Sequence, residues 1–229
     1  MLQLINKKKI YFYLISFLFL STISNNHYVN GFKKNFLINK IDIQIDRTYL
    51  KKIILQNAKF LLNNNIFSIN SEILKDKFNK LNYLENIEIK KKYPSTIIIK
   101  ANKTEYLAET FIEEKKYFVG RNGKFISAEY HDHKNSLPMI FGTFKIKDFL
   151  KLQSDLNRNN INLKKIKKYY YHKNKRWDLY LDKEIILMLP SNNLSDAIKI
   201  FKKYDLNNEI KIKTIIDLRI PNRIITRNG

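Results

Sequence analysis

The sequence predicts an α+β fold. An N-terminal transmembrane helix would be followed by a β-α-α-β-β module and then by a mostly antiparallel, β-rich domain with flanking helices. Apolar residues recur at helical spacing between residues 48 and 62 and again between 71 and 81. In the segments that flank these helices, apolar and polar residues alternate, as expected of strands with one buried face. Beyond residue 107, short alternating segments separated by turn residues predominate, which indicates antiparallel strands.

The N-terminus combines a basic flank with an apolar run. Residues 7–9 are lysines, and an uncharged stretch runs from Ile10 until Lys33. Its strongly apolar part is shorter than the roughly 20 residues of a spanning helix, so a cleaved signal peptide, a buried helix and a retained anchor are the alternatives. No Ala-x-Ala-like cleavage pattern follows it. We therefore favour a transmembrane anchor at 10–29, with residues 1–9 cytoplasmic by the positive-inside rule and the bulk of the chain exported.

The module after the anchor contains two amphipathic helices. Residues 36–45 alternate and predict a strand, and Thr48 can cap a helix that ends at three consecutive asparagines. Asn70 or Ser71 can cap the second helix. A strand over 84–92 and another starting at residue 97 complete a three-stranded sheet with both helices on one face.

The chain turns sharply between the last two strands of this module. Pro94 cannot donate a hydrogen bond to a sheet, and it restricts the backbone of Tyr93. The sequence Tyr93-Pro94-Ser95-Thr96 therefore predicts a turn.

The second half reads as strands with two helices. The last strand is expected at an edge of the sheet. The expected elements are strands at 107–112, 117–119 and 124–126, a loop or short strand at 137–142, a helix at 146–156, strands at 161–171, 176–181 and 184–189, a helix at 194–206, and strands at 214–219 and 223–227.

The chain is strongly basic, with a formal net charge of +22 at pH 7 and a sequence pI near 9.9. Such a charge favours an anionic partner such as nucleic acid or a lipid surface. The abundance of Lys, Asn and Ile is equally the composition expected of an AT-rich genome, and the lysines are spread along the chain instead of gathering in one stripe. A nucleic-acid-binding protein would need a cytoplasmic chain with its charge on one face.

Few residues offer chemistry. The absence of cysteine excludes disulfides, thiolate catalysis and Cys-ligated metals. His131-Asp132-His133 has no identifiable third ligand, and His172 has no nucleophile or orienting carboxylate at a recognisable spacing. The basic and aromatic run at 164–173 could bind single-stranded nucleic acid, but the solvent face of a strand is favoured. No catalytic, cofactor-binding or metal-binding residue is assigned.

Several short motifs occur together in a specific order. A Tyr-Pro-Ser-Thr turn at 93–96 lies between two alternating strands and is followed by Ala108, and Leu-Pro-x-x-x-Gly occurs at 137–142. Ile-Asp-Leu-Arg occurs at 216–219. In this order the motifs resemble those of the FtsQ/DivIB family of bacterial cell-division proteins. The chain departs from the family pattern at Lys103-Thr104, where Glu-Arg is usual, and at Tyr106, where Pro is usual.

This resemblance implies a POTRA domain at 36–106 and a β-rich, partner-binding domain at 107–229. It implies a non-enzymatic, single-pass scaffold in the bacterial inner membrane at the division septum, with a periplasmic bulk and no cofactor, nucleic-acid partner or small-molecule substrate. Its partners would be other divisome membrane proteins, including a small coiled-coil pair that adds a strand to the C-terminal edge. The predicted partner-binding residues are Asp217, Leu218, Arg219, Ile220, Asn222 and Arg223.

Strand addition would use main-chain hydrogen bonds, so a proline at a backbone donor within 214–219 is expected to abolish it. The alternatives are another POTRA-containing, membrane-anchored export or assembly factor, which would lack the Leu-Pro-x-x-x-Gly and Asp-Leu-Arg motifs, and the basic nucleic-acid-binding protein.

Overall fold

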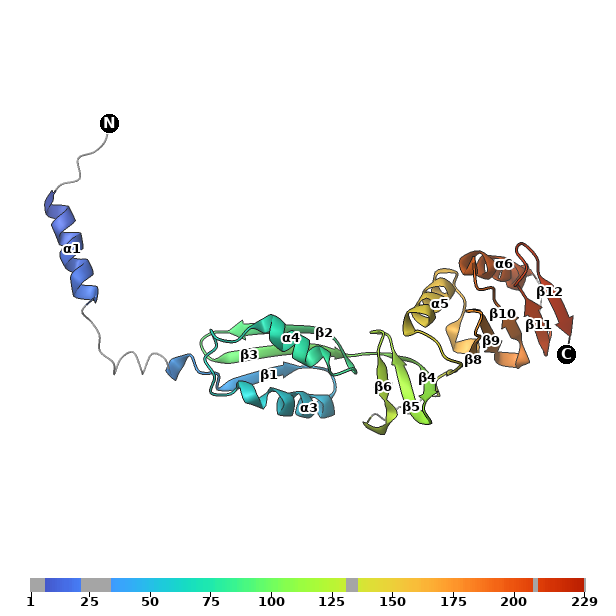
Figure 1. Ribbon diagram of the computed structural model, residues 1–229, viewed down its shortest axis with the longest axis horizontal. Coiled ribbons are helices and arrows are strands. Elements are labelled where there is room, and N and C mark those ends of the chain that lie inside the picture. The colour runs from blue at the N-terminus through green and yellow to red at the C-terminus, as the bar shows by residue number, and fades with distance from the viewer. Residues whose placement is uncertain (1–6, 22–33, 131–135, 208–209, 229) are drawn as a thin grey trace, which may run out of the picture. The chain divides into compact units, whose positions relative to one another are not determined.

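The computed structural model describes residues 7–21, 34–130, 136–207 and 210–228. The chain divides into two compact units, Met1–Phe78 with Asn86–Ala101 and Asn79–Glu85 with Asn102–Gly229. Figure 1 labels the helices and strands of both units. The helices are α1 (Lys7–Ser21), α3 (Thr48–Ala58), α4 (Ser71–Asn79), α5 (Ile146–Arg158) and α6 (Leu194–Asn207).

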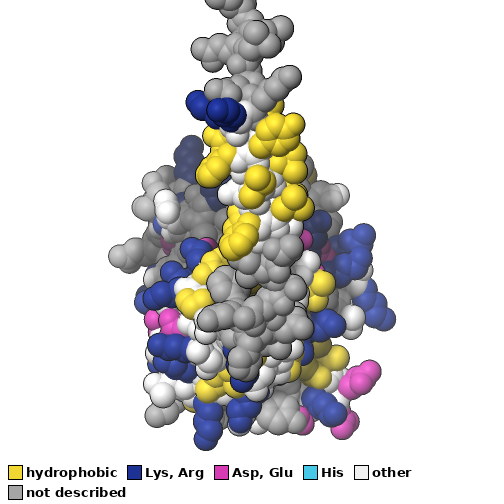
Figure 2. Space-filling view, turned by 90° about the vertical axis from the view of Figure 1, so that its left-hand side faces the viewer, with side chains coloured by type: hydrophobic (Ala, Val, Ile, Leu, Met, Phe, Trp, Pro, Cys, Tyr) yellow, Lys and Arg dark blue, Asp and Glu magenta, His cyan; other side chains and the backbone are white. Residues whose placement is uncertain are grey.

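α1 is a helix of 15 residues that carries apolar side chains around its whole surface. Its residues 8–21 are all exposed in the structure, including the tyrosines and phenylalanines. Figure 2 shows hydrophobic side chains along the helix and basic ones at one end. No helix in the described part of the chain reaches the combined length and hydropathy of a membrane span.

The first unit is built on a three-stranded sheet in the order β1-β3-β2, formed by β1 (Lys40–Gln44), β2 (Leu84–Lys92) and β3 (Thr96–Lys103). β1 runs parallel to β3. One face of β3 buries Ile97, Ile99 and Ala101, and α3 and α4 bury apolar side chains in turn. The residues between them on β3 are more exposed, so both helices cover the same face, and the expected β-α-α-β-β module is confirmed.

The first strand is shorter than the 36–45 segment expected. Residues 36–38 bond to the connection between the helices instead: the Ile38 N–H donates to the Asn64 carbonyl (2.9 Å), and the Ile66 N–H donates to the Phe36 carbonyl (2.9 Å). Part of the alternating segment thus pairs with a loop. Periodicity predicts an extended backbone, but it does not show whether the partner of that backbone is a strand or a loop.

The second unit contains one nine-stranded sheet in the order β12-β11-β10-β9-β8-β7-β4-β5-β6. Five of its eight neighbouring pairs are antiparallel, as expected, but β7 pairs in parallel with both β4 and β8, and β10 pairs in parallel with β11. The strands are β4 (Tyr106–Ile112), β5 (Lys115–Gly120), β6 (Phe125–Ser127), β7 (Met139–Phe141), β8 (Ile166–Tyr171), β9 (Trp177–Leu181), β10 (Ile186–Met188), β11 (Thr214–Asp217) and β12 (Ile225–Asn228).

One face of this sheet forms the core. The row of paired residues Ile140, Tyr169, Leu179, Leu187 and Ile216 crosses five strands and is buried throughout. The buried apolar residues of α5 and α6 belong to the same cluster, so both helices cover this face. Burial raises the pKa of Tyr169, whose hydroxyl accepts a hydrogen bond from Gln153 of α5 (2.8 Å).

Several strand ends differ from the sequence prediction for local reasons. The segment expected as a strand from 161 begins with a 3₁₀ turn, because the Asn162 side chain accepts the Lys164 N–H (3.0 Å). Lys183 and Glu184 have positive φ and form a turn before β10. β11 ends at Asp217, two residues earlier than expected, and the last strand covers 225–228.

Candidate partner-binding edge

β12 lies at one end of the sheet and pairs with β11 alone among the described strands. An edge strand presents backbone N–H and C=O groups that can pair with an added strand. β11 itself lies between β10 and β12. A proline at a backbone donor within 214–217 would therefore also remove a hydrogen bond inside the second unit, so the loss of partner capture expected of it stays a prediction that a substitution in β12 tests more cleanly.

The hydrogen bonds of β11 alternate between its two neighbours. The Leu218 N–H donates to the Met188 carbonyl (3.0 Å), so the backbone groups of Leu218 point towards β10. Because alternate residues of a strand point their backbone groups in opposite directions, Ile215 and Asp217 point theirs towards β12.

The same alternation identifies the outward groups of β12. Arg227 and Ile225 lie opposite Ile215 and Asp217 and pair with them. Thr226 and Asn228 therefore direct their N–H and C=O groups away from the sheet. These two residues are the backbone positions at which an added strand would bond.

The six predicted residues lie at and after the end of β11. Leu218 is only 2% exposed and belongs to the core. Arg219, Asn222 and Arg223 are exposed, and Ile220 is 46% exposed. Leu218 is therefore mainly a core residue, while Arg219, Ile220, Asn222 and Arg223 are accessible for contact.

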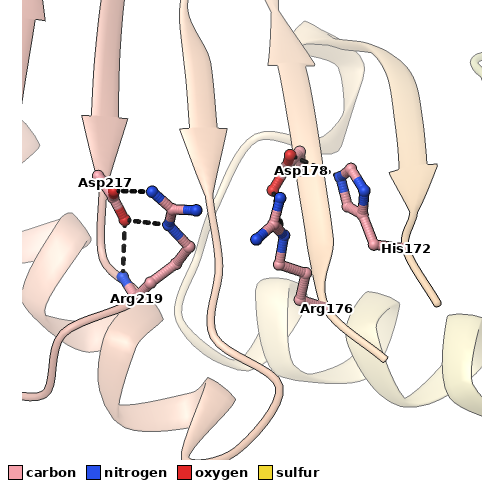
Figure 3. Close-up of polar contacts among 5 residues, drawn as sticks. All are labelled: His172, Arg176, Asp178, Asp217 and Arg219. Carbon is pink, nitrogen blue, oxygen red and sulfur yellow. Dashed lines mark hydrogen bonds and ion pairs between the residues drawn. The ribbon is translucent and has the colours of Figure 1, made fainter. Parts of the chain in front are cut away.

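Residues 218–224 connect β11 to β12. Asp217 and Arg219 form a clasp that fixes the start of this connection (Figure 3). The Arg219 backbone N–H and Nε donate to Asp217 Oδ1 (3.0 and 2.8 Å), and Nη2 donates to Oδ2 (2.5 Å). These hydrogen bonds hold the pKa of Asp217 below its ordinary value and raise the pKa of Arg219. The clasp ties up both charges, so Arg219 orders the connection and is not a free cation.

The connection borders a pocket of about 230 Å³. Five of the six predicted residues, all except Asp217, line it together with the start of α6 and the residues before that helix. Ile200 and Ala197 supply apolar wall from α6. The structure thus brings the predicted residues together around a hollow that could receive an apolar side chain next to the edge strand.

Strands β7 to β10 have apolar and aromatic side chains on the face opposite α5 and α6, where they are only partly buried. Phe141, Tyr170, Tyr180 and Met188 lie here, and the Phe141 and Tyr170 rings stack with their centroids 4.6 Å apart. This pattern explains the basic and aromatic run at 164–173. Its tyrosines alternate between the core and the opposite face, so they do not form a continuous stacking platform.

His172 does have a carboxylate partner, contrary to the expectation. Its Nε2 lies 2.6 Å from Asp178 Oδ2, and Arg176 Nε lies 3.7 Å from the other oxygen (Figure 3). The hairpin between β8 and β9 brings these residues together, because the His172 N–H donates to the Arg176 carbonyl (3.0 Å). The group links two strand ends, and the described contacts place no nucleophile on the imidazole.

Across the described residues, no group of three or more His, Asp or Glu side chains is placed to hold a metal ion. His131-Asp132-His133 lies outside the described residues.

We predict that Asp217→Asn destabilises the second unit by about 1 kcal/mol at neutral pH, a modest loss because Arg219 is well exposed and water screens the pair. A carboxyl with a lowered folded pKa contributes stability above its ordinary value, here 3.8, and loses it as the pH falls through the folded value. The difference in unfolding free energy between wild type and Asp217→Asn should therefore narrow as the pH falls below 3.8. Urea unfolding from about pH 7 to about pH 2, with Asp205→Asn as an exposed control, measures it. A gap independent of pH would contradict the clasp.

The comparisons with known proteins match both units. The model "POTRA domain, FtsQ-type" matches residues 36–102, and "Cell division protein FtsQ/DivIB, C-terminal" matches 111–219. The second match ends before β12 begins. Together the two matches cover the β-α-α-β-β module and the sheet from the end of β4 to β11.

Curated relatives share the same description at low identity. "Cell division protein FtsQ" of Rhizobium radiobacter is 21% identical over 160 residues, covering 69% of this chain and 76% of the relative. The protein of that name from Rickettsia bellii (strain RML369-C) is 24% identical over 195 residues, covering 84% and 71%. The match to that from Agrobacterium fabrum covers only 50% of the relative.

A solved structure, the major extracytoplasmic domain of the cell division protein DivIB from Geobacillus stearothermophilus, is 12% identical. It matches with a TM-score of 0.33 over 48% of this chain and 98% of that one, a score at which the likeness adds nothing to the assignment. The two domain models and the curated relatives are sufficient for it: the chain belongs to the FtsQ/DivIB family of cell division proteins.

Proposed function

We propose that this protein is a non-enzymatic, bitopic scaffold of the divisome in the bacterial inner membrane. Its two exported units would bind other division proteins at the septum. The observation that carries the proposal is the β12 edge, which presents outward backbone groups beside a pocket lined by five of the predicted contact residues. Such a surface suits recognition of an extended segment and needs no catalytic group.

α1 supplies the support for membrane attachment. A helix that is apolar on all sides and exposed along its whole length needs a cover, because water does not solvate such a surface favourably. The three lysines at its start would stay on the cytoplasmic side. The uncharged sequence also continues beyond Ser21, so a span at 10–29 includes residues outside the described helix.

The partner segment would add a strand to β12. Thr226 and Asn228 would supply the main-chain hydrogen bonds, and a side chain of the partner would occupy the pocket beside Ile220. We assign this role to the membrane-proximal part of a small coiled-coil pair of division proteins. The POTRA unit would contact the remaining membrane proteins of the divisome.

The proposal predicts a topology that reporter fusions can measure. Alkaline phosphatase, active only outside the cytoplasm, is fused after Asn35 or after Gly229 in the full chain, and a cytoplasmic reporter is fused at the same sites. We expect phosphatase activity at both sites, in a membrane-bound product of full size. Cytoplasmic reporter activity at both sites would refute the scaffold, and the +22 charge would then favour a nucleic-acid partner.

A further inference from the structure

Three segments of the first unit meet at one end of its sheet, the end at which the chain arrives from α1. They are residues 34–40, the connection 59–70 and the turn 91–96. The Leu37 backbone pairs with Asn65, and the Asn39 N–H donates to the Ser95 carbonyl (3.0 Å). Because these contacts are backbone bonds, the side chains of the three segments are held in fixed positions near one another.

Aromatic rings gather on the outside of this end. The Phe67 ring stacks on Tyr93 with centroids 5.2 Å apart and contacts Phe36 at 5.0 Å. Phe67 is 59% exposed and Tyr93 is 54% exposed. We refer to Phe36, Phe67 and Tyr93 as the aromatic end. A contiguous exposed aromatic group of this kind marks an interaction surface, unlike a single exposed apolar residue.

The three segments that form this end carry positive charge and no negative charge. The three segments contain five lysines and no Asp or Glu. Four of these lysines, at 34, 40, 59 and 92, are exposed. The opposite end of the same unit, where β1 leads into α3, carries Asp46 beside Arg47 and so lacks this one-sided charge.

The chain itself keeps the aromatic end close to wherever α1 lies. Residues 22–33 connect Ser21 to Lys34 and can span at most about 45 Å when fully extended. A tether of this length gives the aromatic end a high effective concentration at the surface in which α1 is held, so that a weak affinity is enough.

We propose that the aromatic end is a membrane-contacting surface: its three rings lie at the level of the lipid headgroups and its lysines contact anionic lipid. The Tyr93 ring has a polar tip that favours this depth, the Phe36 and Phe67 rings would bury apolar area at the boundary of the headgroups, and basic residues favour the negative surface of a bilayer. The proposal rests on the proposed membrane attachment of α1. Its consequence is that the POTRA unit docks on the bilayer with its sheet end.

Single-cysteine spin labels can test this contact, because the chain has no cysteine of its own. Ser68→Cys places a label beside Phe67 and leaves all three rings intact. Tyr49→Cys is the matched control, since Tyr49 is 48% exposed at the opposite end of the same unit. Leu14→Cys reports on α1. Each full-length variant is reconstituted in vesicles of phosphatidylethanolamine and phosphatidylglycerol, and collision with oxygen and with a water-soluble nickel chelate is measured.

We expect several-fold lower nickel accessibility at residue 68 than at residue 49, with residue 14 buried in the bilayer. Water-like accessibility at both 68 and 49, with residue 14 buried, would overturn the docking and leave the anchor standing. Water-like accessibility at residue 14 would refute the anchor itself. Protection of residue 68 that is lost when the protein is diluted with excess lipid in the vesicles would assign the cover to another protein copy, and would overturn lipid contact.

A second variant tests the rings directly. Adding Phe67→Ser and Tyr93→Ser to the S68C chain removes two exposed rings, and nickel accessibility at residue 68 should rise to the value at residue 49. Thermal unfolding confirms that the unit remains folded. Protection that persists without the rings would overturn their role. Vesicles lacking phosphatidylglycerol should give an intermediate value if the lysines contribute.

Discussion

Replacing Gly142 by alanine is expected to destabilise the second unit by several kcal/mol. Gly142 has φ +92°, which side-chain-bearing residues rarely adopt, and a Cβ built there would lie 2.1 Å from the carbonyl oxygen of Tyr171. That oxygen is backbone at the end of β8, so it cannot move aside like a flexible side chain. We estimate about 1–2 kcal/mol for the conformation and a similar or larger cost for the displaced strand.

Gly123 provides the matched control. It also has positive φ, at +77°, but a Cβ there would meet only Leu150 Cδ1 at an ordinary 3.5 Å. Gly123→Ala should therefore cost only the conformational part, about 1 kcal/mol. Trp177, the single tryptophan, is buried in the same core and reports urea unfolding of both variants by fluorescence. Equal losses in the two variants would contradict the close approach of Gly142 to β8.

The Gly142 contact also gives a physical reason for the Leu-Pro-x-x-x-Gly motif. β7 ends at Phe141 and lies between β4 and β8, so the chain must leave the middle of the sheet immediately afterwards. Only a residue without a side chain can pass so close to the end of β8. The motif is visible in the sequence, but this role depends on β8, a parallel partner whose paired residues lie 29 positions further along the chain.

Elements governed by local signals could be predicted closely. Periodicity predicted the starts of α5 and α6 and both ends of β2. The cap expected at Thr48 is wrong, because Thr48 is already the first residue of α3 and Arg47 occupies the cap position without a side-chain hydrogen bond. Parallel pairing was not predictable in this way. β7 has three residues and contacts strands reached through long connections, so its own pattern carries no information on its neighbours.

In the candidate site, too, local features could be predicted and features that depend on strand pairing could not. The six predicted residues were identified by resemblance, and five of them do line one pocket. The clasp between Asp217 and Arg219 was readable in principle, because opposite charges two residues apart lie on one side of an extended chain. The contact of His172 with Asp178 required the register of the β8–β9 hairpin, which fixes which residues meet across the turn.

Replacing Thr226 by proline should abolish capture of the coiled-coil partner while leaving the fold intact. The Thr226 N–H points away from β11, so proline removes a donor that only an added strand would use. A lost main-chain hydrogen bond that leaves the partner's carbonyl unpaired costs about 1–3 kcal/mol, or roughly 5- to 150-fold in affinity, and the pyrrolidine ring adds a steric obstacle to pairing.

Two controls separate capture from folding. Thr226→Ala removes the side chain and keeps the donor, so it should bind the partner within a few-fold of wild type. Arg227→Pro removes a donor directed at β11 and should lower the stability of the second unit itself, since that bond closes the sheet. Binding measured by pulldown, alongside urea unfolding, distinguishes the three. If Thr226→Pro bound as tightly as Thr226→Ala, the partner would have to contact the pocket without pairing to β12, and strand addition would be refuted.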